Sequence, residues 1–247
     1  MKATTRDKLI QLNREFYQTF AQQFSNTRMR LQPGVLKVLK YLPANCRLLD
    51  LGCGNGELAY QLGQDDFNGT YVGLDNSKEL INIARQRFDA DFPALFLHAD
   101  LSTPAWESAL SSISDPALKP PYDIVFAFAF VHHLPGVATR LQLLQKIYKL
   151  LRPAGQFIHS EWQFLNSPRL RRRIQPWEVI ELNAIEVDPD DYLLDWRAGG
   201  NGLRYVHHFS LAELSELASS TGFEIRETFY SDGEGGKLGL YQVWQQA

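Results

Sequence analysis

Three glycines at alternate positions, Gly52, Gly54 and Gly56, follow the apolar run of residues 48–51. Glycine has no side chain, so such a turn brings a ligand close to the backbone. Its N–H groups, and those of a following helix start, can then hold an anionic group. Asp50 lies within that run, where its carboxylate can bind a cationic amine. A ligand that carries both a carboxylate and an ammonium group, as S-adenosylmethionine does, fits this combination.

Two further carboxylates follow the next two apolar runs. Asp75 comes directly after residues 70–74, and an acid at that place can accept hydrogen bonds from both hydroxyls of a ribose. Asp100 follows the run of residues 94–97, where it can accept a hydrogen bond from an adenine amino group. The alternative for Asp100 is the N-cap of a helix that begins just after it.

The spacing of the glycines distinguishes between nucleotide cofactors. A dinucleotide site uses the pattern G-x-G-x-x-G, but its third glycine position is occupied here by Glu57, whose charge would repel a pyrophosphate. We therefore expect S-adenosylmethionine as the cofactor. The expected contacts are Asp50, Gly52, Cys53, Gly54, Gly56, Asp75, Asn76, Asp100, Leu101 and Phe128.

The elements that must position these residues alternate along the chain between strand and helix patterns. Strands are predicted at residues 48–51, 70–74, 94–97, 122–130 and from 156, with helices at 4–24, 33–42, 78–88, 137–151 and 211–220. Residues 223–230 and 238–245 predict a closing antiparallel pair. This order predicts an α/β fold with a doubly wound, mostly parallel, seven-stranded sheet. Ligands bind such sheets at the carboxyl ends of the strands, where the acids and glycines lie.

The chain has the length of one α/β domain, with 247 residues of which 45% are hydrophobic. We expect a helical cap over residues 1–45, a cofactor-binding core over 46–162 and a substrate-side insertion after the fifth strand, over 163–203. Residues 204–247 are expected to hold the last helix and the closing strands. The insertion is set apart because its arginines, tryptophans and acidic stretch interrupt the strand–helix alternation.

Charge and cysteine content exclude several classes. The net charge of −3 argues against a generally basic nucleic-acid binder but leaves room for a local basic patch. Cys46 and Cys53 are too few and too close for a disulfide framework, which favours reduced thiols and a cytoplasmic setting. No apolar run is long enough to cross a bilayer, no secretory signal is expected at the start, and no Cys/His cluster has metal-ligand spacing.

Methyl transfer from a sulfonium is an in-line displacement, and a base is needed only if the nucleophile carries a proton. Residues 127–133, after the fourth strand, lack the Asn/Asp-Pro-Pro-aromatic run typical of enzymes that methylate exocyclic amines. An oxygen acceptor, carboxylate or hydroxyl, remains. His132 and His133 are candidates for a base or a substrate contact, with a structural pair at the strand end as the alternative. Of His207 and His208, at most one can face the site.

Several segments resemble the class I S-adenosylmethionine-dependent methyltransferases. More specifically, they resemble the family that forms the methyl ester of 5-carboxymethyluridine at the tRNA wobble position. The likeness covers most of the chain, with departures at Gln32, where the family has Trp, and at residues 234–237, where it has Gly-Asn-Trp. The segments that carry it are residues 24–28, 50–56, 131–134, 150–153, 204–209 and 230–233.

The resemblance implies a tRNA carboxymethyl side chain as the acceptor and a small zinc-binding activator protein as a possible partner. It favours Arg28 as the clamp on the acceptor carboxylate, with Arg204 second, because Arg can form two parallel hydrogen bonds to a carboxylate. The rivals are a small-molecule O-methyltransferase acting on a quinone, lipid or secondary metabolite, and a non-catalytic subunit of the same fold. The catalytic candidates are therefore Arg28, Arg204, His132 and His133.

A run of arginines in the insertion has two interpretations. It can bind a phosphate backbone, or it can be a solvated helix face paired with Glu178 or Glu181. The sequence alone slightly favours the solvated face. The four residues are Arg169, Arg171, Arg172 and Arg173.

Overall fold

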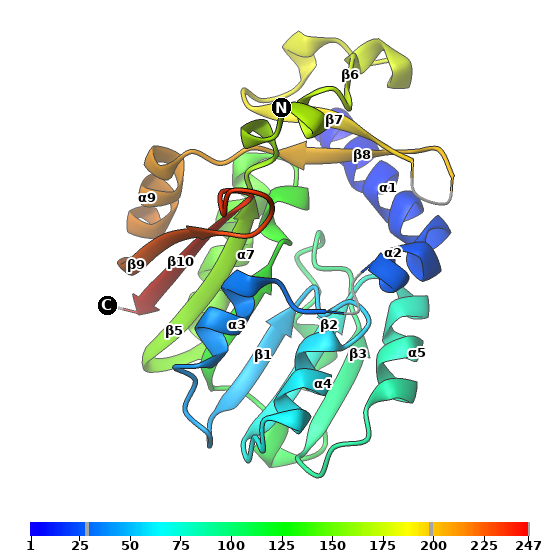
Figure 1. Cartoon of the computed structure of the whole chain (residues 1–247). Helices are drawn as coiled ribbons and strands as arrows, with labels where there is room; N and C mark the ends of the chain where they lie inside the picture. Colours follow the sequence, from blue (N-terminus) through cyan, green and yellow to red (C-terminus); the bar gives the residue numbers. More distant parts are fainter. Residues whose placement is uncertain (28–29, 198–199, 247) are drawn as a thin grey trace.

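The computed structural model describes residues 1–27, 30–197 and 200–246. Seven strands form its main sheet: β1 (Arg47–Leu51), β2 (Thr70–Asp75), β3 (Ala94–His98), β4 (Tyr122–Phe128), β5 (Leu151–Trp162), β9 (Phe223–Ser231) and β10 (Gly239–Gln246). Their spatial order is β3-β2-β1-β4-β5-β10-β9 (Figure 1). Only β10 runs antiparallel to its neighbours β5 and β9. The predicted mostly parallel, seven-stranded sheet is confirmed.

Helices cover both faces of this sheet. One face packs against α3 (Pro33–Leu39), α4 (Glu57–Gln64) and α5 (Lys78–Arg87). The other packs against α7 (Val137–Leu150) and α9 (Leu211–Ser220), with the short α6 (Ser108–Ser111) beside them. The two layers make the fold doubly wound, as predicted. The boundaries of α3, α5, α7 and α9 lie within three residues of those expected from the sequence.

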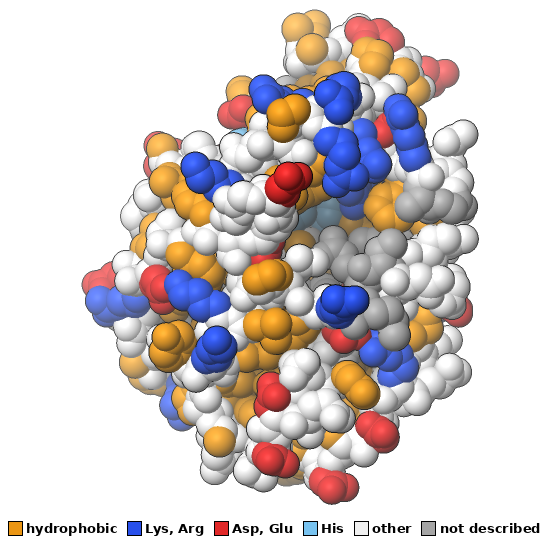
Figure 2. Space-filling model, in the orientation of Figure 1, with side chains coloured by type: hydrophobic (Ala, Val, Ile, Leu, Met, Phe, Trp, Pro, Cys, Tyr) orange, Lys and Arg blue, Asp and Glu red, His pale blue; other side chains and the backbone are white. Residues whose placement is uncertain are grey.

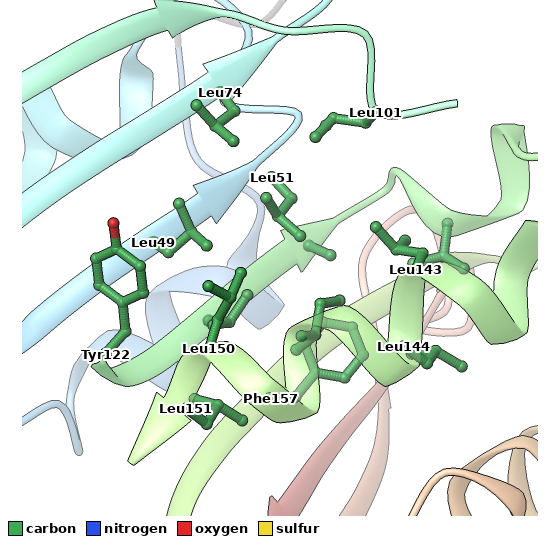
Figure 3. Packing of buried hydrophobic residues seen from close by; sticks show 14 of the residues in the cluster. Leu49, Leu51, Leu74, Leu101, Tyr122, Leu143, Leu144, Leu150, Leu151 and Phe157 are labelled. Atoms are coloured by element: carbon green, nitrogen blue, oxygen red, sulfur yellow. The ribbon is translucent and has the colours of Figure 1, made fainter. Parts of the chain in front are cut away.

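The packing under α7 shows why the sequence forms this layer. Leu143, Leu144 and Leu150 recur at helical spacing and point from α7 toward the sheet, where Leu49 and Phe157 meet them (Figure 3). All five side chains are buried. The same apolar periodicity that predicted the helix therefore packs α7 on the sheet whose strand ends carry the cofactor-binding loops.

The N-terminal segment forms two helices where one was predicted. α1 (Ala3–Thr19) ends at Phe20, whose φ of −107° and ψ of 18° leave the helical region, and α2 (Ala21–Thr27) follows at once. Phe20 packs with Phe16 and Trp196, so tertiary contacts hold the break. Leu9 of α1 is fully buried against the small sheet described next.

The insertion carries a second, three-stranded antiparallel sheet. It consists of β6 (Ile174–Gln175), β7 (Asp191–Trp196) and β8 (Gly202–His207), preceded by the short helix α8 (Pro168–Arg171). The small sheet spans residues 174–207, so its last strand crosses position 203, the expected end of the insertion. Together with α1 it lies above the carboxyl ends of the main strands (Figure 1).

β5 begins at Leu151, five residues before its predicted start, because Leu151 already pairs with Tyr122 before an irregularity in the ladder. Beyond β4, a short 3-10 turn over Val131–His133 places the histidine pair. Within the described ranges, no helix combines the length and the apolar character needed to cross a membrane.

Candidate active site

A cavity of about 580 Å³ opens at the carboxyl ends of β1, β2, β4 and β5. β1 and β4 lie where the strand order reverses, which is where open α/β sheets bind ligands. Every residue predicted to contact the cofactor lines this cavity except Gly56. His132, His133 and Arg204 line it too, so the structure brings the predicted cofactor and acceptor residues into one space.

The glycine turn has the backbone conformation that only glycine adopts without strain. Gly52, Gly54 and Gly56 have φ of 79°, 56° and 76°. A Cβ at Gly54 would meet nothing within 4 Å, since this residue faces the cavity, whereas one at Gly56 would lie 2.9 Å from the Cβ of Ala84. Gly54 therefore leaves open space beside the backbone that a ligand could enter, and Gly56 serves the packing of α4 on α5.

The expectation that bare glycine N–H groups bind the anion needs correction. Gly52 and Cys53 both donate to the Leu74 carbonyl, at 2.8 and 3.0 Å, and Gly54 donates to Oδ2 of Asp75 at 2.9 Å. These amides close the turn itself. The anion-binding capacity of the loop therefore lies in the first turn of α4, whose N–H groups have no acceptor within the helix.

Asp50 is only 4% exposed and accepts a hydrogen bond from the Tyr71 hydroxyl to Oδ2 at 2.6 Å. Burial raises the pKa of Asp50 to about 7, the Tyr71 hydrogen bond opposes this rise, and the charge of Asp75 adds to it. A buried carboxylate of this kind gains from a cationic partner. The donor set thus fits the ammonium group of S-adenosylmethionine.

Asp75 is held by two backbone amides. Ser77 donates to its Oδ1 at 2.8 Å and Gly54 to its Oδ2 at 2.9 Å. Burial raises the pKa of Asp75, while these hydrogen bonds lower it. Because a carboxylate has about four acceptor positions, two remain for the hydroxyls of a ribose.

Asp100 does not cap a helix, because α6 begins only at Ser108. Its Oδ1 instead accepts hydrogen bonds from the N–H and the hydroxyl of Ser102, at 3.1 and 2.5 Å. Its Oδ2 pairs with the Arg14 guanidinium of α1. The N-terminal helix is thus tied directly to the far end of the cofactor cavity.

His133 is held by its neighbours on both ring nitrogens. Nδ1 donates to the Tyr205 carbonyl at 3.1 Å, and Nε2 lies 2.7 Å from the Tyr17 hydroxyl. A carbonyl only accepts, so the Nδ1 proton is assigned, and in the neutral ring Nε2 accepts from Tyr17. His132 is buried against Glu161, with 2.9 Å between Nδ1 and Oε2.

Arg204 of β8 is 6% exposed and lies among three aromatic rings. Its Cζ is 4.7 Å from the ring centroid of Trp162 and 5.5 Å from those of Phe16 and Trp196. Such contacts position a guanidinium through its faces, and a guanidinium binds a planar anion through its N–H edges. Arg28, the first candidate for the carboxylate clamp, lies outside the described residues.

The arginine run divides between the cavity and the surface. Arg169 and Arg173 line the cavity, whereas Arg171 and Arg172 do not and are exposed. In the described part of the chain, none of the four forms an ion pair with Glu178 or Glu181; Glu181 instead lies 3.7 Å from Lys8. Figure 2 shows Lys and Arg side chains gathered beside a hollow that contains histidine.

His207 and His208 lie outside the cofactor cavity. His207 is buried between Asp191 and Glu213, with 2.7 and 2.9 Å between the paired atoms, and neither it nor His208 lines the cavity. Among the described residues, no group of three or more His, Cys, Asp or Glu side chains is arranged to hold a metal ion.

Three residues that build the site were not predicted from the sequence. Asn13 of α1 exchanges two hydrogen bonds with the Tyr205 backbone and donates a third to the His133 carbonyl. Asp232 accepts from the Gly34 N–H and the Tyr241 hydroxyl, which fixes α3 against the cavity. Glu161 is the third. One feature of the sequence pointed to Asn13: it is a polar residue on the apolar face of α1.

A sequence profile for a methyltransferase domain matches residues 24–228. The chain belongs to this methyltransferase family. The tRNA (carboxymethyluridine(34)-5-O)-methyltransferase of Schizosaccharomyces pombe is 26% identical over 227 residues, which are 87% of this chain and 90% of the relative. ALKBH8 of Mus musculus, of the same enzyme name, is 29% identical over 177 residues, or 69% of this chain. The chain spans only 24% of that relative's length.

Solved structures show the same fold. A SAM-dependent methyltransferase of Methanosarcina mazei has a TM-score of 0.64 at 20% identity, covering 87% of this chain and 98% of its own. A Haloferax volcanii methyltransferase in complex with its activator Trm112 has a TM-score of 0.63 at 17% identity, covering 94% and 96%. This methyltransferase is therefore an S-adenosylmethionine-dependent enzyme, and the predicted non-catalytic alternative is set aside.

Proposed function

We propose that this methyltransferase transfers the methyl group of S-adenosylmethionine to a carboxylate oxygen, that of the carboxymethyl side chain on a modified wobble uridine in tRNA. The names of two relatives support the substrate. The single observation that carries the proposal is the aromatic-held Arg204 in the cofactor cavity. When bound, the cofactor supplies an electrophilic methyl group, and the protein aligns the acceptor with it.

The geometry of the loops supports the following cofactor-binding roles. Asp50 would hold the ammonium group, and the first turn of α4 would hold the carboxylate. Asp75 would accept from the ribose hydroxyls. Asp100 would accept from the adenine amino group on Oδ2, which keeps a lone pair beside the Arg14 contact, because Oδ1 already accepts two hydrogen bonds from Ser102. Asn76, Leu101 and Phe128 would line the adenosine part of the cavity.

An acceptor carboxylate suits this site because it is ionised near neutral pH and needs no base. The hydrogen bonds of His133 to Tyr17 and Tyr205 favour a positioning role over proton transfer. Arg204 would hold the carboxylate in line with the methyl group, and Arg28 remains a second proposed clamp.

The tRNA part of the proposal rests on the basic rim of the cavity. Arg30, Arg169 and Arg173 line it beside Arg204, and phosphate neutralisation by such side chains supplies much of the affinity for nucleic acid. A small-molecule acceptor such as a quinone or lipid would instead favour an apolar wall under the insertion, where Arg169 and Arg173 lie. We further propose that a Trm112-type activator assists the enzyme, by analogy with the Haloferax complex.

The test uses anticodon stem-loop RNA with 5-carboxymethyluridine at the wobble position. The matched control carries 5-carbamoylmethyluridine, which has the same shape without the charge. Reactions with S-adenosylmethionine, with and without a Trm112-type activator, are read by mass spectrometry of the nucleosides. We expect a methyl ester only from the acid. Absence of ester in both activator arms, with methylation in a small-metabolite extract, would instead identify the small-molecule enzyme.

A further inference from the structure

Glu161, near the end of β5, is an ionisable side chain with almost no contact with water. It is 1% exposed, and both of its carboxyl oxygens contact histidines. Oε2 lies 2.9 Å from Nδ1 of His132 and accepts the His132 N–H at 3.1 Å, while Oε1 lies 2.9 Å from Nδ1 of His159. His132 lines the cavity and His159 does not, so Glu161 connects the cavity to the core.

The surroundings of His159 determine where its proton lies. The ring stacks on Phe157 at 4.9 Å and meets the edge of Trp244 at 4.7 Å. Burial lowers the pKa of His159 to about 3, so the ring is neutral. Its Nε2 is buried without a partner among the described residues. An unpaired acceptor costs less than an unpaired N–H, so the proton lies on Nδ1 and is donated to Oε1 of Glu161.

A backbone amide then determines the state of His132. The Trp162 N–H donates to Nδ1 of His132 at 3.3 Å, which requires a lone pair on that nitrogen. Oε2 of Glu161 lies 2.9 Å from the same nitrogen, so a proton must lie on the oxygen to make the contact a hydrogen bond. The one lone pair of Nδ1 then accepts from both donors, and the Trp162 contact is the longer of the two. Burial raises the pKa of Glu161 well above its usual range, in agreement with a neutral carboxyl group.

We propose that Glu161 is a positioning residue that carries a proton on Oε2 and donates it to Nδ1 of His132, so that the ring proton of His132 lies on Nε2. The catalytic role of this proton rests on the proposed function. A donor at this place can hydrogen-bond an anionic acceptor oxygen but cannot remove a proton from a hydroxyl. The charged groups that face Glu161 are Arg140 of α7, which favours ionisation, and Glu213 of α9, which opposes it.

The experiment begins with the wild-type protein at pH 7. Imidazole ¹⁵N NMR reports which nitrogen of His132 is protonated, and ¹³C NMR of the Glu161 carboxyl carbon reports its ionisation. His132→Gln and Glu161→Gln assign the two signals. If Glu161→Gln does not fold, contacts to Trp162 and His159 assign its signal. We expect an unprotonated Nδ1 and a protonated carboxyl group. A protonated Nδ1 or an ionised Glu161 would overturn the inference.

Two substitutions test the donor in catalysis. The side-chain amide of Gln can reach the Nε2 position of His132, whereas that of Asn reaches the Nδ1 position. We expect kcat/KM of His132→Gln to exceed that of His132→Asn at least about tenfold, because the Asn variant loses one hydrogen bond to a charged group. Equal collapse of both variants would contradict the donor role. The NMR result does not depend on the acceptor, so failure of the tRNA assay and failure of this inference remain distinguishable.

Discussion

The buried pair of Asp50 and Tyr71 predicts that cofactor affinity falls in acid. The ammonium group needs an ionised Asp50, whose pKa is about 7. Its ionised fraction is then roughly nine-tenths at pH 8 and one-tenth at pH 6, so the dissociation constant of S-adenosylhomocysteine should rise about tenfold, or about 1.4 kcal/mol. Titration calorimetry between pH 6 and 8 measures this. An affinity that does not change over this range would refute the assignment of Asp50.

Tyr71→Phe tests the cause. A hydrogen bond to a charged group is worth ~1.5–3 kcal/mol, so its loss should move the midpoint of the pH dependence up by about one to two units. Tyr122→Phe is the matched control, because Tyr122 is equally buried but donates to the Leu118 carbonyl instead. If both variants share the wild-type midpoint, Tyr71 does not support the ionised form of Asp50.

The same burial gives Asp50 an opposite effect on stability. Its pKa in the folded protein lies above the ordinary 3.8, so the group favours the fold at low pH. That contribution is lost as the pH rises from about 4 to about 7. Asp50→Asn removes the cost of burying an ionised carboxylate. At pH 8 the free energy of unfolding of the ligand-free variant should therefore exceed that of the wild type by up to about 4 kcal/mol. Urea unfolding at pH 5 and pH 8 checks this, and a difference that does not grow with pH would contradict it.

Three further substitutions test a packing contact, an ion pair and the proposed clamp of the site. Gly34→Ala would place a Cβ 2.3 Å from the Tyr241 ring and should cost ~1–3 kcal/mol of unfolding free energy in urea titration, whereas an unchanged midpoint would contradict the packing. Arg14→Gln removes the pair with Asp100, so stopped-flow measurements should show faster cofactor dissociation with less than about 1 kcal/mol lost in stability. Arg204→Lys keeps the charge but not the planar fork, and kcat/KM should fall roughly tenfold or more. Wild-type kinetics in Arg204→Lys would exclude it as the clamp.

Local patterns in the sequence were enough to predict the sheet and the cofactor loops. Apolar runs alternate with helical periodicity, and each acid lies within two residues of the end of its own strand, so Asp50, Asp75 and Asp100 could be placed from neighbouring residues. The break at Phe20 was missed because the apolar spacing of α1 continues through it. Its packing in one cluster with Phe16 and Trp196, the latter far along the chain, accounts for the end of the helix.

The residues that join the site together could not be found in this way. Asn13 meets Tyr205 across 192 positions, and Gly34 meets Asp232 across 198. Such pairs leave no periodic pattern, because each partner is an ordinary polar or small residue in its own segment. The role of Glu161 likewise could not be predicted, because it depends on His159 of β5 and on His132 in the turn after β4, which the fold brings to its two carboxyl oxygens.

These contacts lead to a last prediction about the reaction. Both nitrogens of His133 are held by hydrogen bonds, and the proposed state of His132 presents a proton, so neither ring is arranged to act as a base. The acceptor must then arrive already ionised, which a carboxylate does. With both substrates saturating, kcat should be constant from pH 7 to pH 9. Only kcat/KM for the cofactor should fall below pH 7, as Asp50 takes up its proton. A fall of the saturated kcat with an apparent pKa between 6 and 7 would indicate a histidine base and a hydroxyl acceptor.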